Sequence, residues 1–345
     1  MIRVLFRCDA NSTIGFGHFN RCLVVANELI KHGVCCVFVI SEVKELILND
    51  INPLFKLIER EWVDERSDAE NIVFLCRKES INYVVVDDYR AKVLFQEILL
   101  LNKIQWLQFY SPFPDKILAD IAVCNNPAVV HNDFIGKAVS STTRCLLGLK
   151  YALIRDELQD LKPISKDKSK YNILLSFGGG DDRGAIEKCL DALNLLSEHF
   201  ILHVVVVSGE KNPRNVSNKK MLCKYGFELD YFIQPDDFSL IYQMADLAVM
   251  AGGTSSYEAI FYKLPMIILS IADNQIEQSF ALENIGVAQY IGKLENTSCQ
   301  DVSLALSRLL ANDAKLQNMR ANAEVLVDGK GKERIVNAIL GLEIL

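Results

Sequence analysis

The sequence lacks the segments that would send a protein into or across a membrane. It has no run approaching the ~20 consecutive apolar residues of a membrane helix, and its first residues show no basic segment ahead of a long apolar core. It also lacks any CxxC pair, although it contains ten cysteines. Because several of these cysteines lie inside apolar runs, we expect reduced core residues. These absences predict a cytoplasmic protein with no membrane insertion.

The sequence also has fewer basic than acidic residues, 37 Lys and Arg against 44 Asp and Glu. The net charge is −7 and the isoelectric point is about 5.4, which argues against a nucleic-acid-binding protein. The sequence contains no HExxH, no clustered Cys/His set, no GxSxG and no P-loop, so nothing supports metal, serine-nucleophile or kinase chemistry. We expect no metal and no cofactor. An acidic protein can still bind a pyrophosphate through local amides or arginines.

Apolar runs of strand length alternate with helical patterns along the whole chain, which predicts an α/β fold of parallel sheets covered by helices. The 345 residues suffice for two domains. Strands are predicted at 2–8, 35–40, 83–87, 104–109 and 120–123, and again at 171–177, 201–207, 230–233, 246–250 and 265–270.

A polar stretch separates the two series, so we expect two Rossmann-like domains that face each other across a cleft. The predicted boundaries are residues 1–155 for the first domain, 156–170 for a linker and 171–345 for the second. A helix is predicted at 21–32, ended by Gly33. The helical stretch 303–345 is longer than one helix needs, and we expect its last part to pack back on the first domain.

Ligands of such sheets bind at the carboxyl ends of the strands, so the loops that follow the strands carry the candidate residues. After the first strand, Gly15 and Gly17 allow a close backbone approach, and His18 stands where a proton acceptor could meet a phosphate-linked carbon. A tight turn with His18 as a capping or solvent-facing residue fits the same spacing equally well.

Two loops of the second half are rich in glycine. Gly178, Gly179 and Gly180 follow a buried strand, which favours a loop whose amides approach a phosphate over a hairpin tip. The loop after the 246–250 strand offers amides and hydroxyls to a pyrophosphate, and Glu258 could accept hydrogen bonds from both ribose hydroxyls. Glu258 could equally stabilise the helix dipole. The candidate residues of this loop, besides Glu258, are Gly253, Thr254 and Ser255.

The loop at 271–278 has a polar tip containing Asn274 and Gln275. These side chains could address the amide substituents of a sugar, and an ordinary exposed connector is an equally good interpretation.

Together these segments resemble the PseG family, the UDP-2,4-diacetamido-2,4,6-trideoxy-β-L-altropyranose hydrolases of pseudaminic acid biosynthesis. The family's opening pattern is R-x-D-x-x-x-x-I-G-x-G-H-x-x-R-C, and the similarity continues at 148–155, 178–181, 252–258, 273–275 and 328–334. The matching residues of the opening pattern are Arg7, Asp9, Ile14, Gly15, Gly17, His18, Arg21 and Cys22.

The resemblance implies the two-domain GT-B architecture of glycosyltransferases, with UDP held mainly by the C-terminal domain. It implies that His18 is the catalytic histidine, that Tyr89 and Asn274 complete the catalytic set, and that Glu258 binds ribose. The remaining substrate-binding residues that it implies are Asp9, Gly15, Gly17, Arg21, Arg155, Gly178, Gly179, Gly180, Gly253, Thr254, Ser255 and Gln275.

The chain departs from the family at two places on the sugar-facing side. The family's D-H-Y-G is here Asp87-Asp88-Tyr89-Arg90, and an acidic pair after the next strand is replaced by Phe109–Pro112. The exact sugar therefore stays open.

The residues fit hydrolysis of a UDP-sugar to a free sugar and UDP. UDP leaves as a stable anion, so the paired carboxylates of glycosidases are unnecessary. One base, a pyrophosphate clamp and a closed site suffice, and histidine exchanges protons near neutral pH. We expect His18 to activate water, which inverts the anomeric centre and cleaves the C–O bond. A GT-B glycosyltransferase and an inactive UDP-sugar-binding protein are the alternatives, and no oligomeric state is predicted.

Overall fold

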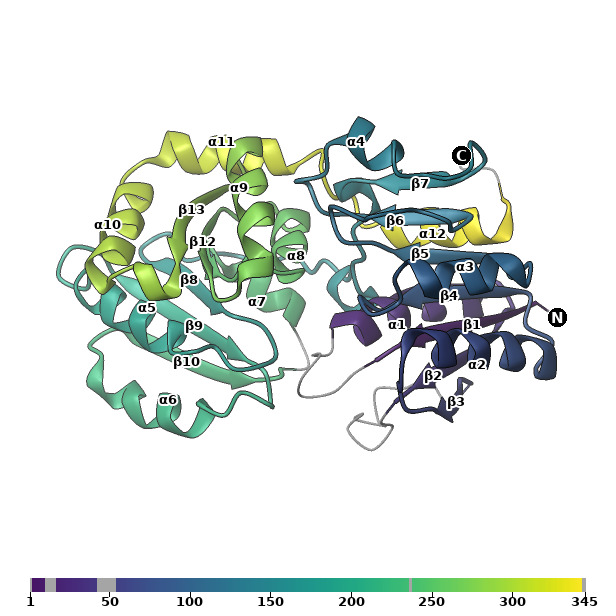
Figure 1. Ribbon diagram of the computed structural model, residues 1–345. Helices are drawn as coiled ribbons and strands as arrows, with labels where there is room; N and C mark the ends of the chain where they lie inside the picture. The colour runs from purple at the N-terminus through teal and green to yellow at the C-terminus, as the bar shows by residue number, and fades with distance from the viewer. Residues whose placement is uncertain (1, 10–16, 42–53, 236–237, 343–345) are drawn as a thin grey trace. The chain divides into compact units, whose positions relative to one another are not determined.

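A computed structural model describes residues 2–9, 17–41, 54–235 and 238–342 (Figure 1). The chain divides into two compact units, Met1–Leu153 with Gly329–Leu345 (unit 1) and Ile154–Asp328 (unit 2). The C-terminal segment thus belongs to unit 1, and residues 156–170 belong to unit 2.

The described strands of unit 1 form a seven-stranded parallel sheet in the order β3-β2-β1-β4-β5-β6-β7. The strands at 35–40 and 83–87 have the predicted bounds. The short strands β3 and β7 were not predicted, because each is only four residues long and its side chains are largely half-buried or exposed. The strands are β1 (Arg3–Cys8), β2 (Cys35–Ile40), β3 (Lys56–Glu59), β4 (Tyr83–Asp87), β5 (Trp106–Phe109), β6 (Ile121–Cys124) and β7 (Arg144–Leu147).

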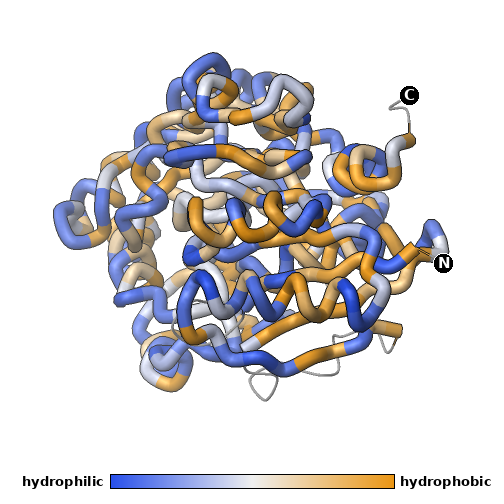
Figure 2. Tube along the Cα trace, turned by 45° about the vertical axis from the view of Figure 1, so that its right-hand side comes forward, coloured by the Kyte–Doolittle hydropathy of each residue, from blue (hydrophilic) through white to orange (hydrophobic). Residues whose placement is uncertain are grey.

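Helices cover both faces of this sheet. The helices are α1 (Gly17–Lys31), α2 (Glu65–Lys78), α3 (Val93–Leu101), α4 (His131–Ile135) and α12 (Gly331–Leu340), with a short 3₁₀ turn η3 (Leu149–Tyr151). Val4 and Phe6 of β1 join the core formed with α1 and α12, while Leu5 joins the core formed with α2 and α3. Burial on both faces explains why the strand is apolar throughout rather than alternating. Figure 2 shows this difference, with orange strands and helices that change between blue and orange.

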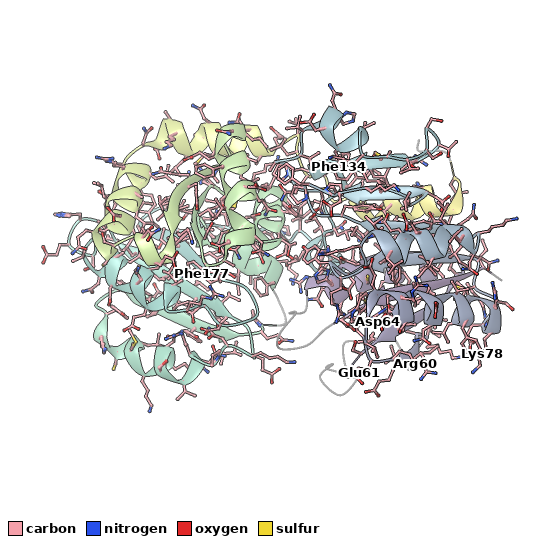
Figure 3. All side chains as sticks on the ribbon, viewed as in Figure 1. Arg60, Glu61, Asp64, Lys78, Phe134 and Phe177 are labelled. Atoms are coloured by element: carbon pink, nitrogen blue, oxygen red, sulfur yellow. The ribbon has the colours of Figure 1, made fainter. Side chains whose placement is uncertain are left out.

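Helix α2 shows how local sequence sets the ends of an element. The carboxylate of Asp64 accepts a hydrogen bond from the backbone N–H of Ser67 at 2.9 Å, and so caps the first turn. Arg77 and Lys78 lie in the last turn, where positive charge complements the helix dipole. Asp64 and Lys78 mark the two ends of this helix in Figure 3.

Helix α12 packs in unit 1, although it lies at the far end of the chain. Ile335 and Val336 are fully buried in the core shared with α1. A Cβ atom at Gly331 would lie 2.1 Å from the carbonyl oxygen of Ala152, so glycine permits this close approach. The guanidinium of Arg334 donates to the carbonyl of Lys150 at 2.8 Å.

Unit 2 contains a six-stranded parallel sheet among its described residues, in the order β10-β9-β8-β11-β12-β13. Its strands are β8 (Tyr171–Ser176), β9 (Leu202–Ser208), β10 (Glu228–Ile233), β11 (Leu247–Met250), β12 (Met266–Ser270) and β13 (Ala288–Lys293). The sequence did not predict β13, since glutamine, glycine and lysine interrupt its apolar residues.

The helices of unit 2 lie between these strands and after β13. They are α5 (Ala185–Asn194), α6 (Asn215–Met221), α7 (Phe238–Met244), α8 (Ser255–Phe261), α9 (Ile276–Ile285), α10 (Cys299–Leu310) and α11 (Asp313–Ala323), with 3₁₀ turns η4 (Asp156–Leu158), η5 (Leu222–Lys224), η6 (Asp273–Gln275) and η7 (Leu294–Asn296). The long helical stretch predicted from residue 303 is divided among α10, α11 and α12.

Candidate functional site

The first candidate site lies at the carboxyl ends of β1 and β4 in unit 1. These strands are neighbours, and Cys8 is paired with Asp87, the last residue of β4. His18 is the second residue of α1, and its Nδ1 atom lies 2.6 Å from Oδ1 of Asp87. Both side chains are buried. Because an ionised carboxylate can only accept, Nδ1 of His18 donates to Asp87, and in a neutral imidazole Nε2 is then the proton acceptor.

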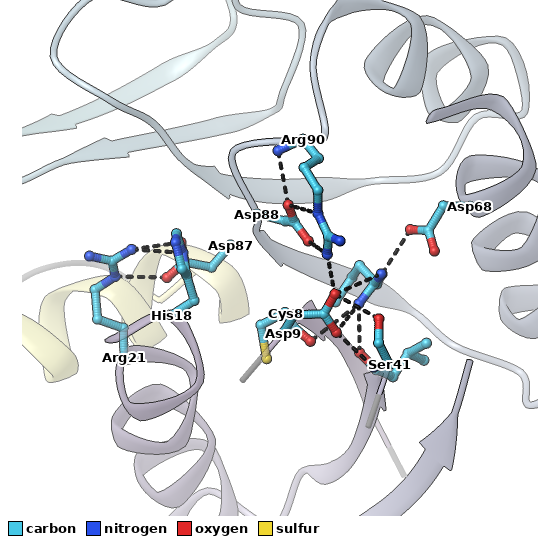
Figure 4. A network of polar contacts seen from close by, with 11 residues as sticks. Cys8, Asp9, His18, Arg21, Ser41, Asp68, Asp87, Asp88 and Arg90 are labelled. Atoms are coloured by element: carbon cyan, nitrogen blue, oxygen red, sulfur yellow. Dashed lines mark hydrogen bonds and ion pairs between the residues drawn. The ribbon is translucent and has the colours of Figure 1, made fainter. Parts of the chain in front are cut away.

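Arg21 secures the same carboxylate from one turn further along α1. Its Nε donates to Oδ2 of Asp87 at 2.7 Å, and its Nη2 donates to Oδ1 at 2.8 Å (Figure 4). Burial alone would raise the pKa of Asp87, but the positive charge of Arg21 holds that pKa below its ordinary value. The structure therefore shows Arg21, a predicted substrate-binding residue, paired with an ionised Asp87 that orients His18.

Tyr89 lies next to this pair. Its ring centroid is 4.4 Å from that of His18, with the planes at 80°, and 56% of the residue is exposed. The structure thus brings together His18 and Tyr89, two of the predicted catalytic residues. Tyr89 is largely exposed beside the buried imidazole, so it can contact a substrate.

A second buried network surrounds Asp9, predicted to bind substrate. The fully buried Arg7 donates to Asp68 at 2.7 Å and to Oδ1 of Asp9 at 3.0 Å (Figure 4). The backbone N–H and the hydroxyl of Ser41 each donate to Asp9 at 2.7 Å. Burial opposes ionisation of Asp9, but Arg7 holds its pKa below the ordinary value. Asp9 is engaged with protein groups and organises the ends of β1 and β2.

Of the two glycines predicted in this loop, Gly15 lies outside the described residues. Gly17 is the exposed first residue of α1, and a Cβ atom there would meet nothing within 4 Å.

In unit 2, the glycine loop after β8 is built around a tight backbone crossing. Gly178 has φ +90°, which favours glycine. A Cβ atom at Gly209 would lie 2.2 Å from the carbonyl oxygen of Gly179, so the loops after β8 and β9 touch through their backbones. Gly179 and Gly180 are exposed, with open space where a Cβ would be.

Asp182 fixes the end of this loop. Its Oδ2 accepts from the backbone N–H of Ile186, in the first turn of α5, at 2.9 Å, and its Oδ1 accepts from Asn212 at 3.0 Å. Its carboxylate is therefore used inside the protein. Within the described ranges, no three His, Cys, Asp or Glu side chains are grouped so as to hold a metal ion.

The loop after β11 is held by Gln278, which the sequence analysis did not select. The buried side chain of Gln278 donates to the carbonyl oxygens of Gly252 at 2.9 Å and Gly253 at 3.0 Å, and accepts from the hydroxyl of Tyr257 at 2.7 Å. In a trans peptide the C=O and the following N–H point in opposite directions. The N–H groups of Gly253 and Thr254 are therefore turned away from Gln278. No sequence signal distinguished Gln278 from a surface glutamine of α9.

Glu258 and Arg155, both predicted to bind substrate, lie together. The Arg155 Nε and Glu258 Oε1 atoms are 3.5 Å apart, and the hydroxyl of Tyr242 donates to Oε2 of Glu258 at 3.1 Å. Burial raises the pKa of Glu258 above its ordinary value. Thr254 is exposed and Ser255 is half-buried at the start of α8.

Asn274 and Gln275 lie on η6, after β12. Asn274 is exposed. The side-chain oxygen of Gln275 accepts from the backbone N–H of Ile271 at 3.0 Å, so it braces its own loop.

In the part of the chain that the structure describes, no helix has the length and apolar character needed to cross a membrane.

Comparison with known proteins finds distant relatives. No protein-family model matches the chain. The spore coat polysaccharide biosynthesis protein SpsG of Bacillus subtilis is 27% identical over 203 residues, 59% of each protein. An uncharacterized protein of Methanocaldococcus jannaschii is 25% identical over 280 residues, 78% of this chain and 55% of that protein. The chain thus spans less than two thirds of the length of these two relatives.

The UDP-2,4-diacetamido-2,4,6-trideoxy-β-L-altropyranose hydrolase of Campylobacter jejuni is 22% identical over 279 residues, 79% of this chain and 93% of that protein.

Solved structures show the fold. Acinetobacter baumannii MurG superposes with a TM-score of 0.73 at 14% identity, covering 99% of this chain and 100% of that one. The Staphylococcus aureus MnaA–UDP co-structure gives a TM-score of 0.70 at 15% identity, covering 99% and 98%. The prediction of fold class is confirmed: the chain has two parallel α/β sheets in a GT-B-like fold, and it is distantly similar in sequence to SpsG and to the Campylobacter hydrolase.

Proposed function

We propose that the protein hydrolyses a UDP-linked 2,4-diacetamido-2,4,6-trideoxy sugar to the free sugar and UDP, in nonulosonate biosynthesis of the pseudaminic acid type. The observation that carries the proposal is the buried pair of His18 and Asp87, with 2.6 Å between Nδ1 and Oδ1. Distant similarity to the Campylobacter hydrolase, over 93% of that protein, supports it.

In the proposed reaction, the oxygen of water attacks the anomeric carbon from the face opposite UDP. Nε2 of His18 takes the proton of that water, and the ionised Asp87 stabilises the imidazolium. The bond between the anomeric carbon and the phosphate oxygen breaks, and its electron pair leaves with UDP. The anomeric centre is inverted, and no cofactor takes part.

The proposal assigns the nucleotide to unit 2. The outward N–H groups of Gly253 and Thr254 suit the diphosphate, as do the exposed Gly179 and Gly180. Glu258 would accept hydrogen bonds from the ribose hydroxyls, and the fold shared with the MnaA–UDP co-structure is consistent with a bound UDP. Tyr89 and Asn274 would position the water or the acetamido groups of the sugar.

The test is incubation with a panel of UDP-diacetamido-sugars and no acceptor, followed by NMR of UDP and of the first-formed anomer. We expect UDP release and an inverted free sugar. UDP release only after a sugar acceptor is added would indicate a GT-B glycosyltransferase, a possibility raised by the fold shared with MurG. Binding without any turnover would indicate an inactive UDP-sugar-binding protein. Either result would overturn the proposal.

A further inference from the structure

Arg90 links the loop after β4 to the residue that follows β1, near the candidate catalytic pair. It follows Tyr89 in the loop after β4. Its Nε donates to Oδ1 of Asp88 at 2.9 Å and its Nη2 donates to Oδ2 of Asp88 at 2.6 Å, while Nη2 also bonds to Oδ2 of Asp9 (Figure 4). One guanidinium thus bridges the loop after β4 to the end of β1.

Asp9, at the other end of this bridge, is itself held by several hydrogen bonds. Asp9 already accepts hydrogen bonds from the buried Arg7 and from Ser41, which follows β2. The guanidinium of Arg90 also lies over the ring of Trp62, 4.3 Å from its centroid, and that of Arg7 lies 5.2 Å from the same centroid. Arg90 is therefore anchored by two carboxylates and an aromatic ring.

Tyr89 stands between the two residues that this bridge fixes. The backbone N–H of Arg90 donates to Oδ1 of Asp88 at 2.9 Å, which closes a tight turn around Tyr89. With Asp88 and Arg90 both held, the backbone of Tyr89 has little freedom. Its ring lies against His18, with 4.4 Å between centroids.

We propose that Arg90 is a positioning residue for the reaction, because its bridge between Asp88 and Asp9 holds Tyr89 against His18. The inference rests on the proposed hydrolase function. Lysine cannot replace arginine here, since an ammonium group lacks the planar fork that serves two carboxylates and stacks on an indole.

The first experiment compares Arg90→Lys and Arg90→Ala with Arg66→Lys, an exposed arginine of α2 whose ion pair with Glu70 spans 3.6 Å. We expect both Arg90 variants to lower kcat by about 10²-fold, as a small misplacement of a catalytic group does. UDP affinity stays unchanged, because the nucleotide is assigned to unit 2. Added guanidinium ion restores part of the activity of Arg90→Ala and does not stimulate the wild type or Arg66→Lys.

If Arg90→Ala does not fold, Asp88→Asn keeps the shape of the bridge and removes one charge, and it should lower kcat with unchanged UDP affinity. A wild-type kcat in Arg90→Lys would overturn the inference. So would a wild-type kcat in a folded Asp88→Asn, or a folded Arg90→Ala whose lost activity added guanidinium does not restore.

A second measurement does not depend on activity. The chain has two tryptophans, and Trp106 is buried in the core, whereas Trp62 lies under Arg90. The contribution of Trp62 to the fluorescence is the part that is lost in Trp62→Phe. We expect Arg90→Lys to change this contribution and Arg66→Lys to leave it unchanged. If the wild type proves inactive on every UDP-sugar, the proposed function fails, and this measurement still tests the bridge. Unchanged emission in a folded Arg90→Lys would reject the bridge itself.

Discussion

The imidazole of His18 is held by the carboxylate of Asp87, with 2.6 Å between Nδ1 and Oδ1, although the two residues are 69 positions apart in the chain. The contact follows from the topology, because β1 and β4 are adjacent and parallel and their carboxyl ends meet at one edge of the sheet. The pair fixes the tautomer of His18 before any substrate binds.

Replacement of His18 by alanine tests its role as the base. We expect His18→Ala to lower hydrolysis by about 10²-fold or more, the usual contribution of a general base. UDP affinity should change little, because the residues assigned to the nucleotide lie in unit 2. His32→Ala, at the exposed end of α1, is the matched control. Turnover in His18→Ala equal to that of the control would remove His18 from the mechanism.

The pairing of Asp87 predicts a pH dependence of stability. The pKa of Asp87 in the folded protein lies below its ordinary value of 3.8. Its ionised form therefore stabilises the fold above that value, and the stabilisation is lost as pH falls through the lower folded pKa. Asp87→Asn leaves the charge of Arg21 without its partner, which costs about 3–5 kcal/mol for a buried pair.

Urea unfolding of both proteins at several pH values measures this effect. The difference in free energy of unfolding should be largest near neutral pH and should shrink in acid. A difference that does not vary with pH would mean that folding does not lower the pKa of Asp87.

Glu258 is predicted to bind ribose through its ionised form. We expect Glu258→Ala to weaken UDP binding by about 1.5–3 kcal/mol, the value of a hydrogen bond to a charged group. Burial raises the pKa of Glu258, so Glu258 is protonated at a higher pH than an ordinary glutamate. As the pH is lowered, the UDP affinity of the wild type should therefore begin to fall above the ordinary pKa range of glutamate. Glu324→Ala, on an exposed ion pair with Lys263, serves as the control in calorimetry. Equal UDP affinity in the two variants would mean that Glu258 does not bind ribose and only contacts Tyr242 and Arg155.

Gly252 and Gly253 are neighbours with different surroundings. A Cβ atom at Gly252 would lie 2.2 Å from Oγ of Ser279, whereas one at Gly253 would meet nothing within 4 Å. Ser279 cannot turn aside cheaply, because its buried hydroxyl donates to the carbonyl of Gln275 at 2.6 Å. We expect Gly252→Ala to lower the free energy of unfolding by about 1–3 kcal/mol, as overpacking does, and Gly253→Ala to change it by less than about 0.5 kcal/mol. Thermal or urea unfolding of the pair distinguishes them, and equal stabilities would contradict the packing of this loop.

The sequence predicted the central strands well, because burial on both faces makes them continuous apolar runs. β2 and β4 have the predicted bounds. It failed at the short strands β3 and β7 and at β13, where hydrogen bonding to a neighbouring strand stabilises apolar segments that are short or interrupted.

The sequence selected single residues of the candidate site, and the structure adds the contacts between them. His18 and Tyr89 were selected, but the role of Asp87 depends on a strand order that local pattern does not give. The rule that loops of adjacent parallel strands share an edge would have brought the two together, had β1 and β4 been recognised as neighbours.

Asp9 and Gln278 make contacts that the sequence did not reveal. Asp9 was expected to bind substrate, and the structure shows its carboxylate bonded to Arg7, Ser41 and Arg90. Gln278 donates to backbone carbonyl groups of the loop after β11. Every residue has such a carbonyl, so the sequence does not indicate which one a side chain contacts.

The central claim is that water, activated by His18, attacks the anomeric carbon of a UDP-sugar. Hydrolysis in ¹⁸O-water, followed by mass spectrometry of both products, tests it most directly. The account predicts the label in the free sugar and none in UDP, because the base acts on a water at the sugar carbon and the amides of unit 2 are assigned to the phosphates. Label in UDP would show attack at phosphorus, which requires a different catalytic group, and would contradict the account.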